Sequence, residues 1–135
     1  MCGIIGIVGK EQVAERLVDG LRRMEYRGYD SSGVCTLADG QLIRRRAPGK
    51  LFNLVKELAR DPAPGMVGIA HTRWATHGAP TAANAHPHAT EVLALVHNGI
   101  IENFKPLREA LIARGRKFES ETDTEVVAHL LSEAV

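Results

Sequence analysis

The chain has 135 residues, 44% of them hydrophobic and 24% charged, a composition typical of one globular domain. Its net charge of +1 gives no electrostatic basis for binding nucleic acid or an anionic membrane. No apolar run approaches the roughly 20 residues that span a bilayer, and no leader is recognisable before Cys2, so we expect a cytoplasmic protein.

The chain opens on an apolar run with glycines, residues 1–9, which predicts a buried strand. If Met1 is removed, Cys2 carries both a thiol and a free α-amino group, and such an amine can be the base that a nucleophile needs. The alternative is a small core hydrophobe, which is our prediction for Cys35. Two cysteines are weak evidence for a disulfide.

Helical and strand-like patterns alternate over the next fifty residues. Apolar side chains recur at helical spacing over residues 13–24, although Gly20 costs this helix about 1 kcal/mol relative to Ala. Asp39-Gly40 between two strand-like runs predicts a β-hairpin. We interpret the basic run 44–46 as a solvated strand end, and residues 51–59 as a second amphipathic helix.

A polar stretch, residues 71–89, separates two further predicted strands at 66–70 and 92–97. The pair Asn98-Gly99 that follows has two interpretations. It is the preferred two-residue turn of a hairpin, and we expect it to join strands. Alternatively, the Asn98 side-chain amide and the Gly99 backbone N–H donate hydrogen bonds to an oxyanion.

The last third predicts two helices, one over residues 104–115 and one whose start has the capping-box spacing of Thr122 and Glu125. The apolar pattern of the second helix continues to Val135, and we expect the chain to be cut short there. Strands and helices are mixed and hairpins are present. This order favours an α+β arrangement of sheets covered by helices.

Three side chains are candidates for recognising a substrate. Arg73 can pair bidentately with the carboxylate of an amino acid, although an ordinary surface arginine fits its sequence context equally well. Trp74 either closes over a ligand or packs in the core. Asp123 either binds a substrate ammonium or favours a helix N-terminus.

The histidines raise the question of a metal site. Their spacing, including His86-Pro87-His88, does not match a zinc template, and we expect no metal. His77 and His86 are instead expected to orient loops by hydrogen bonding. The full set is His71, His77, His86, His88, His97 and His129.

As an ordered set, the motifs of this chain closely resemble the N-terminal glutaminase domain of the glutamine–fructose-6-phosphate aminotransferase family, the glucosamine-6-phosphate synthases. Amidophosphoribosyltransferases and asparagine synthetases share the cysteine start and an Asn-Gly pair, but their arginine loops read differently. The matching segments span nearly the whole chain: 1–4, 25–31, 71–78, 84–88, 97–103 and 120–125.

The resemblance implies the four-layer αββα sandwich of N-terminal-nucleophile hydrolases, truncated at its C-terminal side. Cys2 would attack the side-chain amide of L-glutamine with its own amino group as base, through a water. Asn98 and Gly99 would stabilise the oxyanion. Ammonia would leave, and water would hydrolyse the γ-glutamyl thioester. By the same resemblance, Arg73 would hold the α-carboxylate of glutamine and Asp123 its α-ammonium.

The resemblance also implies a loop that closes over the substrate and excludes water, to which Trp74, Thr76 and His77 would belong. Arg27 matches a family position near the nucleophile, and we expect His86 to support the site. No cofactor is implied.

The chain departs from the family in its length. Residues 1–135 would form an incomplete class II glutamine amidotransferase domain, without the sugar-isomerase domains that bind fructose 6-phosphate. In a parent enzyme, expected to be a homo-oligomer, the ammonia would serve the synthesis of glucosamine 6-phosphate. The alternative is a non-catalytic fragment that binds glutamine weakly or not at all.

Overall fold

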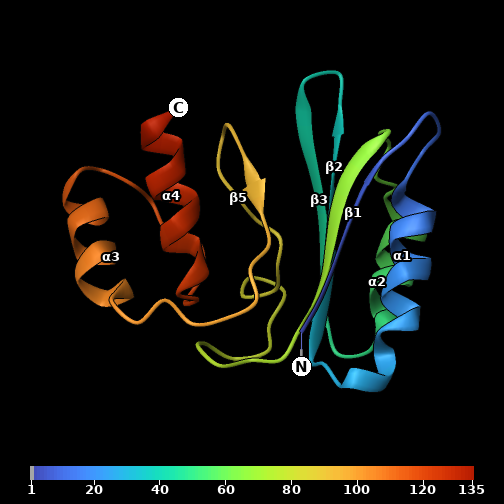
Figure 1. Cartoon of the computed structure of the whole chain (residues 1–135), viewed down its shortest axis with the longest axis horizontal. Coiled ribbons are helices and arrows are strands. Elements are labelled where there is room, and N and C mark those ends of the chain that lie inside the picture. The colour runs from blue at the N-terminus through green and yellow to red at the C-terminus, as the bar shows by residue number, and fades with distance from the viewer. Residues whose placement is uncertain (1) are drawn as a thin grey trace.

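The computed structural model describes residues 2–135, which form four layers (Figure 1). From right to left in Figure 1 these are a helix pair, a four-stranded sheet, a short hairpin and a second helix pair. The α+β class and the αββα layer order are thereby confirmed. The helices are α1 (Ala14–Arg23), η1 (Glu25–Arg27, a 3-10 turn), α2 (Leu51–Arg60), α3 (Phe104–Ala113) and α4 (Thr124–Ala134). The strands are β1 (Gly3–Val8), β2 (Ser31–Ala38), β3 (Gln41–Pro48), β4 (Val67–Arg73), β5 (His88–Ala89) and β6 (Ala94–Leu95).

The main sheet has the order β1-β4-β2-β3, and all its neighbours are antiparallel. Asp39 and Gly40 join β2 to β3 with φ angles of 51° and 75°, as a tight hairpin turn requires, so this predicted hairpin is confirmed. The second sheet pairs only β5 with β6. None of the helices in the described part of the chain is long and apolar enough to cross a membrane.

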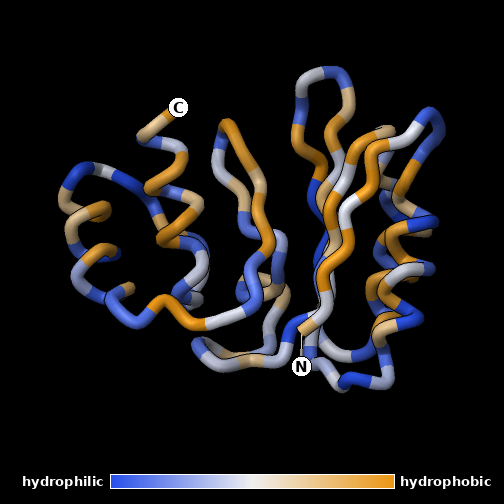
Figure 2. Tube along the Cα trace, in the orientation of Figure 1, coloured by the Kyte–Doolittle hydropathy of each residue, from blue (hydrophilic) through white to orange (hydrophobic). Residues whose placement is uncertain are grey.

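The apolar core lies between the main sheet and helices α1 and α2, whose tubes alternate between blue and orange in Figure 2. Gly20 permits this packing, because a Cβ atom there would lie 2.2 Å from Ile5 Cδ1. Glycine is a poor helix former, but its lack of a side chain lets α1 approach β1 closely. Buried core residues include Val13, Leu17, Val18, Leu21, Val34, Leu51, Leu54 and Ala70.

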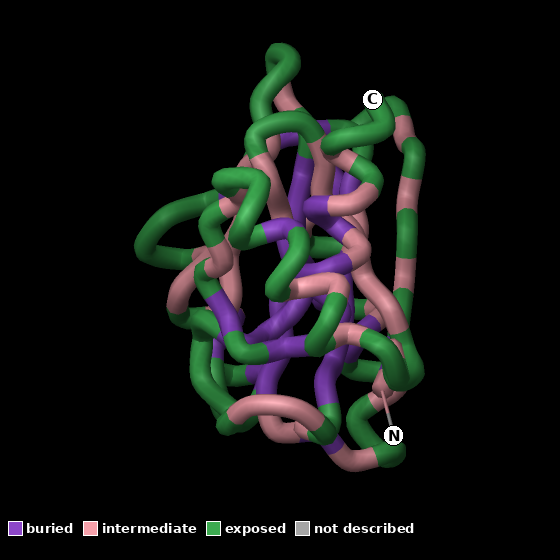
Figure 3. Tube along the Cα trace, turned by 90° about the vertical axis from the view of Figure 1, so that its left-hand side faces the viewer, coloured by how far each residue is buried: buried purple, intermediate pink, exposed green. Residues whose placement is uncertain are grey.

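The opposite face of the sheet meets the second layer through polar groups. Arg46 donates hydrogen bonds to the carbonyl oxygens of Ala83 (3.0 Å) and Ala85 (3.2 Å). Arg44 pairs with Glu119 at 2.9 Å. The prediction of a solvated basic run is therefore wrong for Arg44 and Arg46, since β3 faces another layer here. Figure 3 shows the buried segments running through the middle of the molecule.

Gly33 of β2 lies directly against the segment that carries His86. A Cβ atom at Gly33 would lie 2.0 Å from the His86 carbonyl oxygen, which is main chain and cannot turn away. Only glycine lets this segment lie so near the sheet.

The predicted strands differ from the observed ones in three respects. β1 is an edge strand, and Val8 is 84% exposed, so the prediction of a fully buried strand is wrong. β4 continues through Arg73, into the stretch predicted as loop. The predicted strand 92–97 is reduced to β6, which pairs with β5 ahead of Asn98-Gly99, so that pair is not a hairpin turn.

The predicted capping box at the start of α4 is wrong as well, because α4 has no side-chain cap. The Thr122 hydroxyl lies 2.7 Å from His88 Nε2 instead. The Glu125 carboxylate accepts hydrogen bonds from the backbone N–H groups of Glu119 (2.9 Å) and Ser120 (2.7 Å). Glu125 therefore fixes the loop before the helix rather than its first turn.

Candidate active site

Cys2 lies where β1 begins and β4 ends. The Gly3 N–H donates to Thr72 Oγ1 at 3.0 Å, which anchors the strand start. The Trp74 N–H points at Cys2 Sγ at 3.2 Å. The sulfur is thus held beside the first residues after β4. The removal of Met1, on which a free amino group at Cys2 depends, concerns a residue outside the described range 2–135.

A cavity of about 230 Å³ opens beside Cys2 and brings together residues from distant parts of the chain. It contains a thiol, a guanidinium and a carboxylate, together with Gly99, whereas Asn98 lies next to it in the chain and does not line the cavity. Such a volume suits a small polar molecule. Its walls are formed by Cys2, His71, Arg73, Trp74, Thr76, His86, His97, Gly99, Ile100, Thr122, Asp123 and Thr124.

Arg73 is 4% exposed and shapes the loop over the cavity, so the surface alternative is wrong. Its guanidinium donates to the carbonyl oxygens of His77, Gly78 (3.3 Å) and Ala79 (3.2 Å). Burial lowers the pKa of Arg73, and the nearby carboxylate of Asp30 opposes this. A guanidinium retains its charge under these conditions, so the cavity has a cationic wall.

Asp123 is 3% exposed and precedes α4. One oxygen, Oδ2, accepts a hydrogen bond from the Ile101 N–H at 2.6 Å. The other, Oδ1, lies 3.9 Å from His77 Nδ1. The carboxylate makes no cap bond to the helix. Asp123 lines the cavity, so its Oδ1 can accept a hydrogen bond from a cationic group there.

Asn98 and Gly99 lie on an irregular segment after β6. The Asn98 amide nitrogen donates to the Cys2 carbonyl oxygen at 3.3 Å, and its Oδ1 lies 2.7 Å from His71 Nε2. Gly99 has a φ of 142° and lines the cavity. The Asn98 amide is thereby held against the Cys2 main chain, and Gly99 lines the same cavity as Cys2.

A stack of imidazoles lies behind the cavity. The rings of His71 and His86 are parallel, with centroids 4.1 Å apart, and His88 is 4.5 Å from His86. Burial lowers the pKa of His71 to about 4 and of His88 to about 3, and lowers the pKa of His86 further. All three rings are neutral near pH 7. Among residues 2–135, no group of three or more His, Cys, Asp or Glu side chains is arranged so that it could hold a metal ion.

The remaining predicted site residues differ in how close they lie to the cavity. Trp74 lines the cavity but is 55% exposed, so its core alternative is wrong. Thr76 lines the cavity, whereas His77 lies beside Asp123 and contacts Phe104 edge-on. Arg27 is exposed on η1 and does not line the cavity.

Sequence reasoning missed several cavity residues. His71 was considered only as a metal ligand and Thr124 was not considered, although His71 lies two positions before Arg73 and Thr124 directly follows Asp123. Asp30, whose Oδ2 accepts from the Ala75 N–H at 2.8 Å, fixes the start of the loop. Alternation along β4 offered one signal, because His71 and Arg73 must share a face of that strand.

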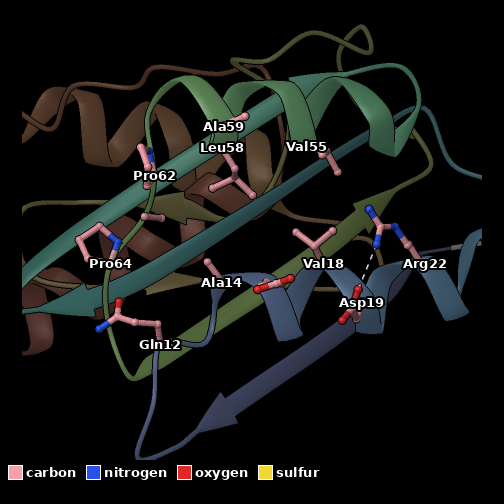
Figure 4. A pocket seen from close by; sticks show the side chains of 12 residues that line it. Gln12, Ala14, Val18, Asp19, Arg22, Val55, Leu58, Ala59, Pro62 and Pro64 are labelled. Carbon is pink, nitrogen blue, oxygen red and sulfur yellow. Dashed lines mark hydrogen bonds and ion pairs between the residues drawn. The ribbon is translucent and has the colours of Figure 1, made fainter.

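A larger hollow of about 630 Å³ lies between α1 and α2, away from Cys2 (Figure 4). Val18, Val55 and Leu58 give it apolar walls, and Asp19 pairs with Arg22 at 3.1 Å on its rim. It contains none of the predicted site residues.

Four αββα layers and a cysteine at the start of the first strand define the class of N-terminal-nucleophile hydrolases. The chain belongs to the glutamine amidotransferase domain family, whose sequence model matches residues 62–134. The resemblance read from the motifs is confirmed.

Curated relatives cover nearly all of this chain. It is 71% identical over 98% of its length to the glutamine–fructose-6-phosphate aminotransferase (isomerizing) of Zymomonas mobilis, and 67% identical over 98% to that of Brucella suis. It spans 22% of the length of each.

Among solved structures, the chain is similar to a glutamine phosphoribosylpyrophosphate amidotransferase from B. subtilis complexed with ADP and GMP. The TM-score is 0.79 at 28% identity, covering 98% of this chain and 29% of that one. A structure described as the allosteric regulatory enzyme of purine biosynthesis matches with the same TM-score at 27% identity and the same coverages.

Proposed function

We propose that this chain forms the glutaminase site of a glutamine–fructose-6-phosphate aminotransferase. The observation that carries the proposal is the single cavity shared by Cys2, Arg73 and Asp123. A nucleophile lies in it together with one fixed cation and one buried anion. Glutamine offers the complementary set, an electrophilic amide with an α-carboxylate and an α-ammonium.

In the proposed reaction, the Cys2 sulfur attacks the side-chain carbonyl carbon of glutamine, and the thiol proton passes to the free α-amino group through a water. The tetrahedral oxyanion accepts hydrogen bonds from the Asn98 amide and the Gly99 N–H. The amine then gives the proton to the departing nitrogen, and ammonia leaves. Water attacks the γ-glutamyl thioester, which releases glutamate and regenerates the thiol.

Recognition of the amino-acid end follows from the fixed charges. Arg73 holds the α-carboxylate and Asp123 the α-ammonium. Because Arg73 also bonds three carbonyl oxygens of residues 77–79, binding of the substrate is coupled to the position of the loop that carries Thr76 and His77. Trp74, half-exposed at the mouth, covers the bound substrate and reduces access of water.

For the longer protein, we propose that the ammonia converts fructose 6-phosphate to glucosamine 6-phosphate on sugar-isomerase domains outside residues 1–135. The chain is then an incomplete class II amidotransferase domain of a homo-oligomeric, cytoplasmic enzyme. Support comes from the 71% identity to a relative named as this aminotransferase.

The test begins with the mass of the mature N-terminus and with glutamate release from glutamine. We expect Met1 to be absent and the protein to release glutamate. Cys2→Ala abolishes this release while binding of glutamine persists. Retained Met1, or equal activity in the alanine variant, contradicts the mechanism. Glutamine binding without turnover in the wild-type protein favours the non-catalytic alternative.

A further inference from the structure

His71 is fully buried on β4 and reaches the Asn98 side chain from the core side. Its Nε2 atom lies 2.7 Å from Asn98 Oδ1, the shortest hydrogen bond that Asn98 makes. Asn98 itself is exposed on an irregular segment. The hydrogen bond to the buried His71 imidazole is therefore the main restraint on the orientation of the exposed Asn98 amide.

The orientation of the Asn98 amide decides its electrostatic effect on the site. A carboxamide turned by half a rotation exchanges an N–H₂ donor for a carbonyl acceptor. The Cys2 carbonyl oxygen can only accept, so the atom that faces it at 3.3 Å is the amide nitrogen. Oδ1 must then face His71, and Nε2 of His71 must carry the hydrogen.

The surroundings of His71 maintain this arrangement. Burial lowers the pKa of the His71 ring, which keeps it neutral near pH 7, and the ring stacks on His86 at 4.1 Å. A neutral imidazole has one N–H, and here that N–H is at Nε2. The other nitrogen, Nδ1, is buried and makes no hydrogen bond of good geometry, although the main chain of His97 lies close enough to the ring to raise its pKa. Moving the hydrogen to Nδ1 would break the 2.7 Å bond between Nε2 and Asn98 Oδ1, which is costly.

We infer that His71 is a positioning residue for glutamine hydrolysis: its Nε2–H holds Asn98 so that the amide N–H₂, and not the carbonyl, faces the oxyanion. This inference rests on the proposed function. His71 lies on the core side of Asn98, so it acts on the reaction through Asn98 and does not contact the oxyanion itself. Its loss should therefore affect the transition state more than the bound ground state, in which no oxyanion exists.

The first experiment compares His71→Leu with His71→Gln. The leucine has no donor for Asn98 Oδ1, whereas the glutamine amide can supply one. We expect His71→Leu to lower kcat about 10- to 100-fold with KM little changed. His71→Gln should recover most of that loss. Unchanged kcat in His71→Leu, or a loss confined to KM, overturns the inference.

The second experiment places His71→Leu in an Asn98→Ala background. If His71 acts only through Asn98, the double variant is no slower than Asn98→Ala alone. Losses that multiply overturn the inference. Comparison of thermal unfolding for all variants identifies any loss that is due to unfolding.

The third experiment needs no turnover, because it reads the imidazole nitrogens of the wild-type protein by ¹⁵N NMR. We expect a protonated Nε2 and an unprotonated Nδ1 on His71, and the reverse pattern overturns the inference. An inactive wild-type protein with the expected tautomer refutes the proposed function but leaves the hydrogen-bond assignment standing. An active protein with multiplicative losses refutes the positioning role alone.

Discussion

Arg73 connects the cavity wall to the loop above it, and this double role makes lysine a poor substitute. Lysine keeps the charge but cannot donate in a fixed fork to several acceptors at once. We expect Arg73→Lys to raise KM for glutamine about 10- to 100-fold, since each charged hydrogen bond contributes about 1.5–3 kcal/mol. Arg22→Lys, on the exposed face of α1, is the matched control and should leave KM unchanged. A similar KM in both variants would count against the binding role.

The buried imidazoles predict how stability depends on pH. The folded pKa values of His71, His86 and His88 lie below the ordinary value of 6.5, so the unfolded chain binds protons first as the pH falls. Their contribution to stability is complete above about pH 6.5 and is lost as the pH falls toward 4 for His71 and 3 for His88. Each group contributes up to about 1.4 kcal/mol per pH unit in that window.

Denaturant unfolding between pH 5 and 7 checks this prediction. Glu125 does not interfere there: burial raises its pKa, but hydrogen bonds from Ser120 and its neighbours outweigh burial and lower the pKa below 4.5. His88→Gln, which can still bond Thr122, should reduce the slope by about one proton. A free energy of unfolding that is flat over this range would mean that the three rings take up protons in the folded state as readily as in the unfolded chain.

At the scale of elements, the contact between α1 and β1 is set by a missing side chain. Gly20→Ala improves helix propensity by about 1 kcal/mol, but the added methyl meets Ile5 Cδ1. Overpacking of this kind costs about 1–3 kcal/mol, so we expect a net loss of stability in chemical denaturation.

Two variants make this test specific. Ile5→Val removes the Cδ1 atom and should restore stability to Gly20→Ala. Gly6→Ala, on the same strand, has no neighbour closer than 3.8 Å and should be neutral or stabilising. Equal losses in Gly20→Ala and Gly6→Ala would point to the strand backbone rather than to the helix contact.

Elements with a local cause could be predicted from the sequence. The periodicity of α1 and α2 and the Asp39-Gly40 turn depend on neighbouring residues only, and the structure has them where expected. Asn98-Gly99 was misjudged because its conformation depends on His71 and Cys2, far away in the chain. Thr122 was misassigned for the same reason, since its partner is His88.

The site shows the same division between local and long-range causes. Arg73, Asp123 and Cys2 could be chosen by residue type and by resemblance to a family. The surroundings of these residues could not be predicted, because their burial and hydrogen-bond partners depend on how two layers of the fold pack together. The basic run 44–46 is predicted to be solvated when only its own sequence is considered, whereas in the structure a second layer covers Arg44 and Arg46.

At the scale of the whole molecule, the two halves have different interiors. The half with α1 and α2 encloses the apolar core, whereas α3 and α4 bury few apolar side chains, among them Leu111, Val126 and Ala128. The layers meet through Arg44, Arg46 and neutral histidines. Contacts of this kind stabilise less per residue than apolar burial does.

Hydrogen exchange should therefore distinguish the two halves. We expect amides of α3 and α4 to exchange at least about tenfold faster than those of β2 and β4, because local opening follows the distribution of buried apolar contacts. Mass spectrometry of peptides from each half measures this directly. Uniform protection would show that the layers unfold as one cooperative unit.

The restraints on the Cys2 main chain have a chemical consequence. A residue that carries a thioester on sulfur beside its own free amine can transfer the acyl group to nitrogen through a small ring, and the resulting amide is inert. The Gly3–Thr72 and Asn98–Cys2 hydrogen bonds, with the Trp74 N–H at the sulfur, limit the rotations that this rearrangement needs. In the proposed mechanism, the anchored strand start would therefore disfavour transfer of the γ-glutamyl group from the Cys2 sulfur to its own amine.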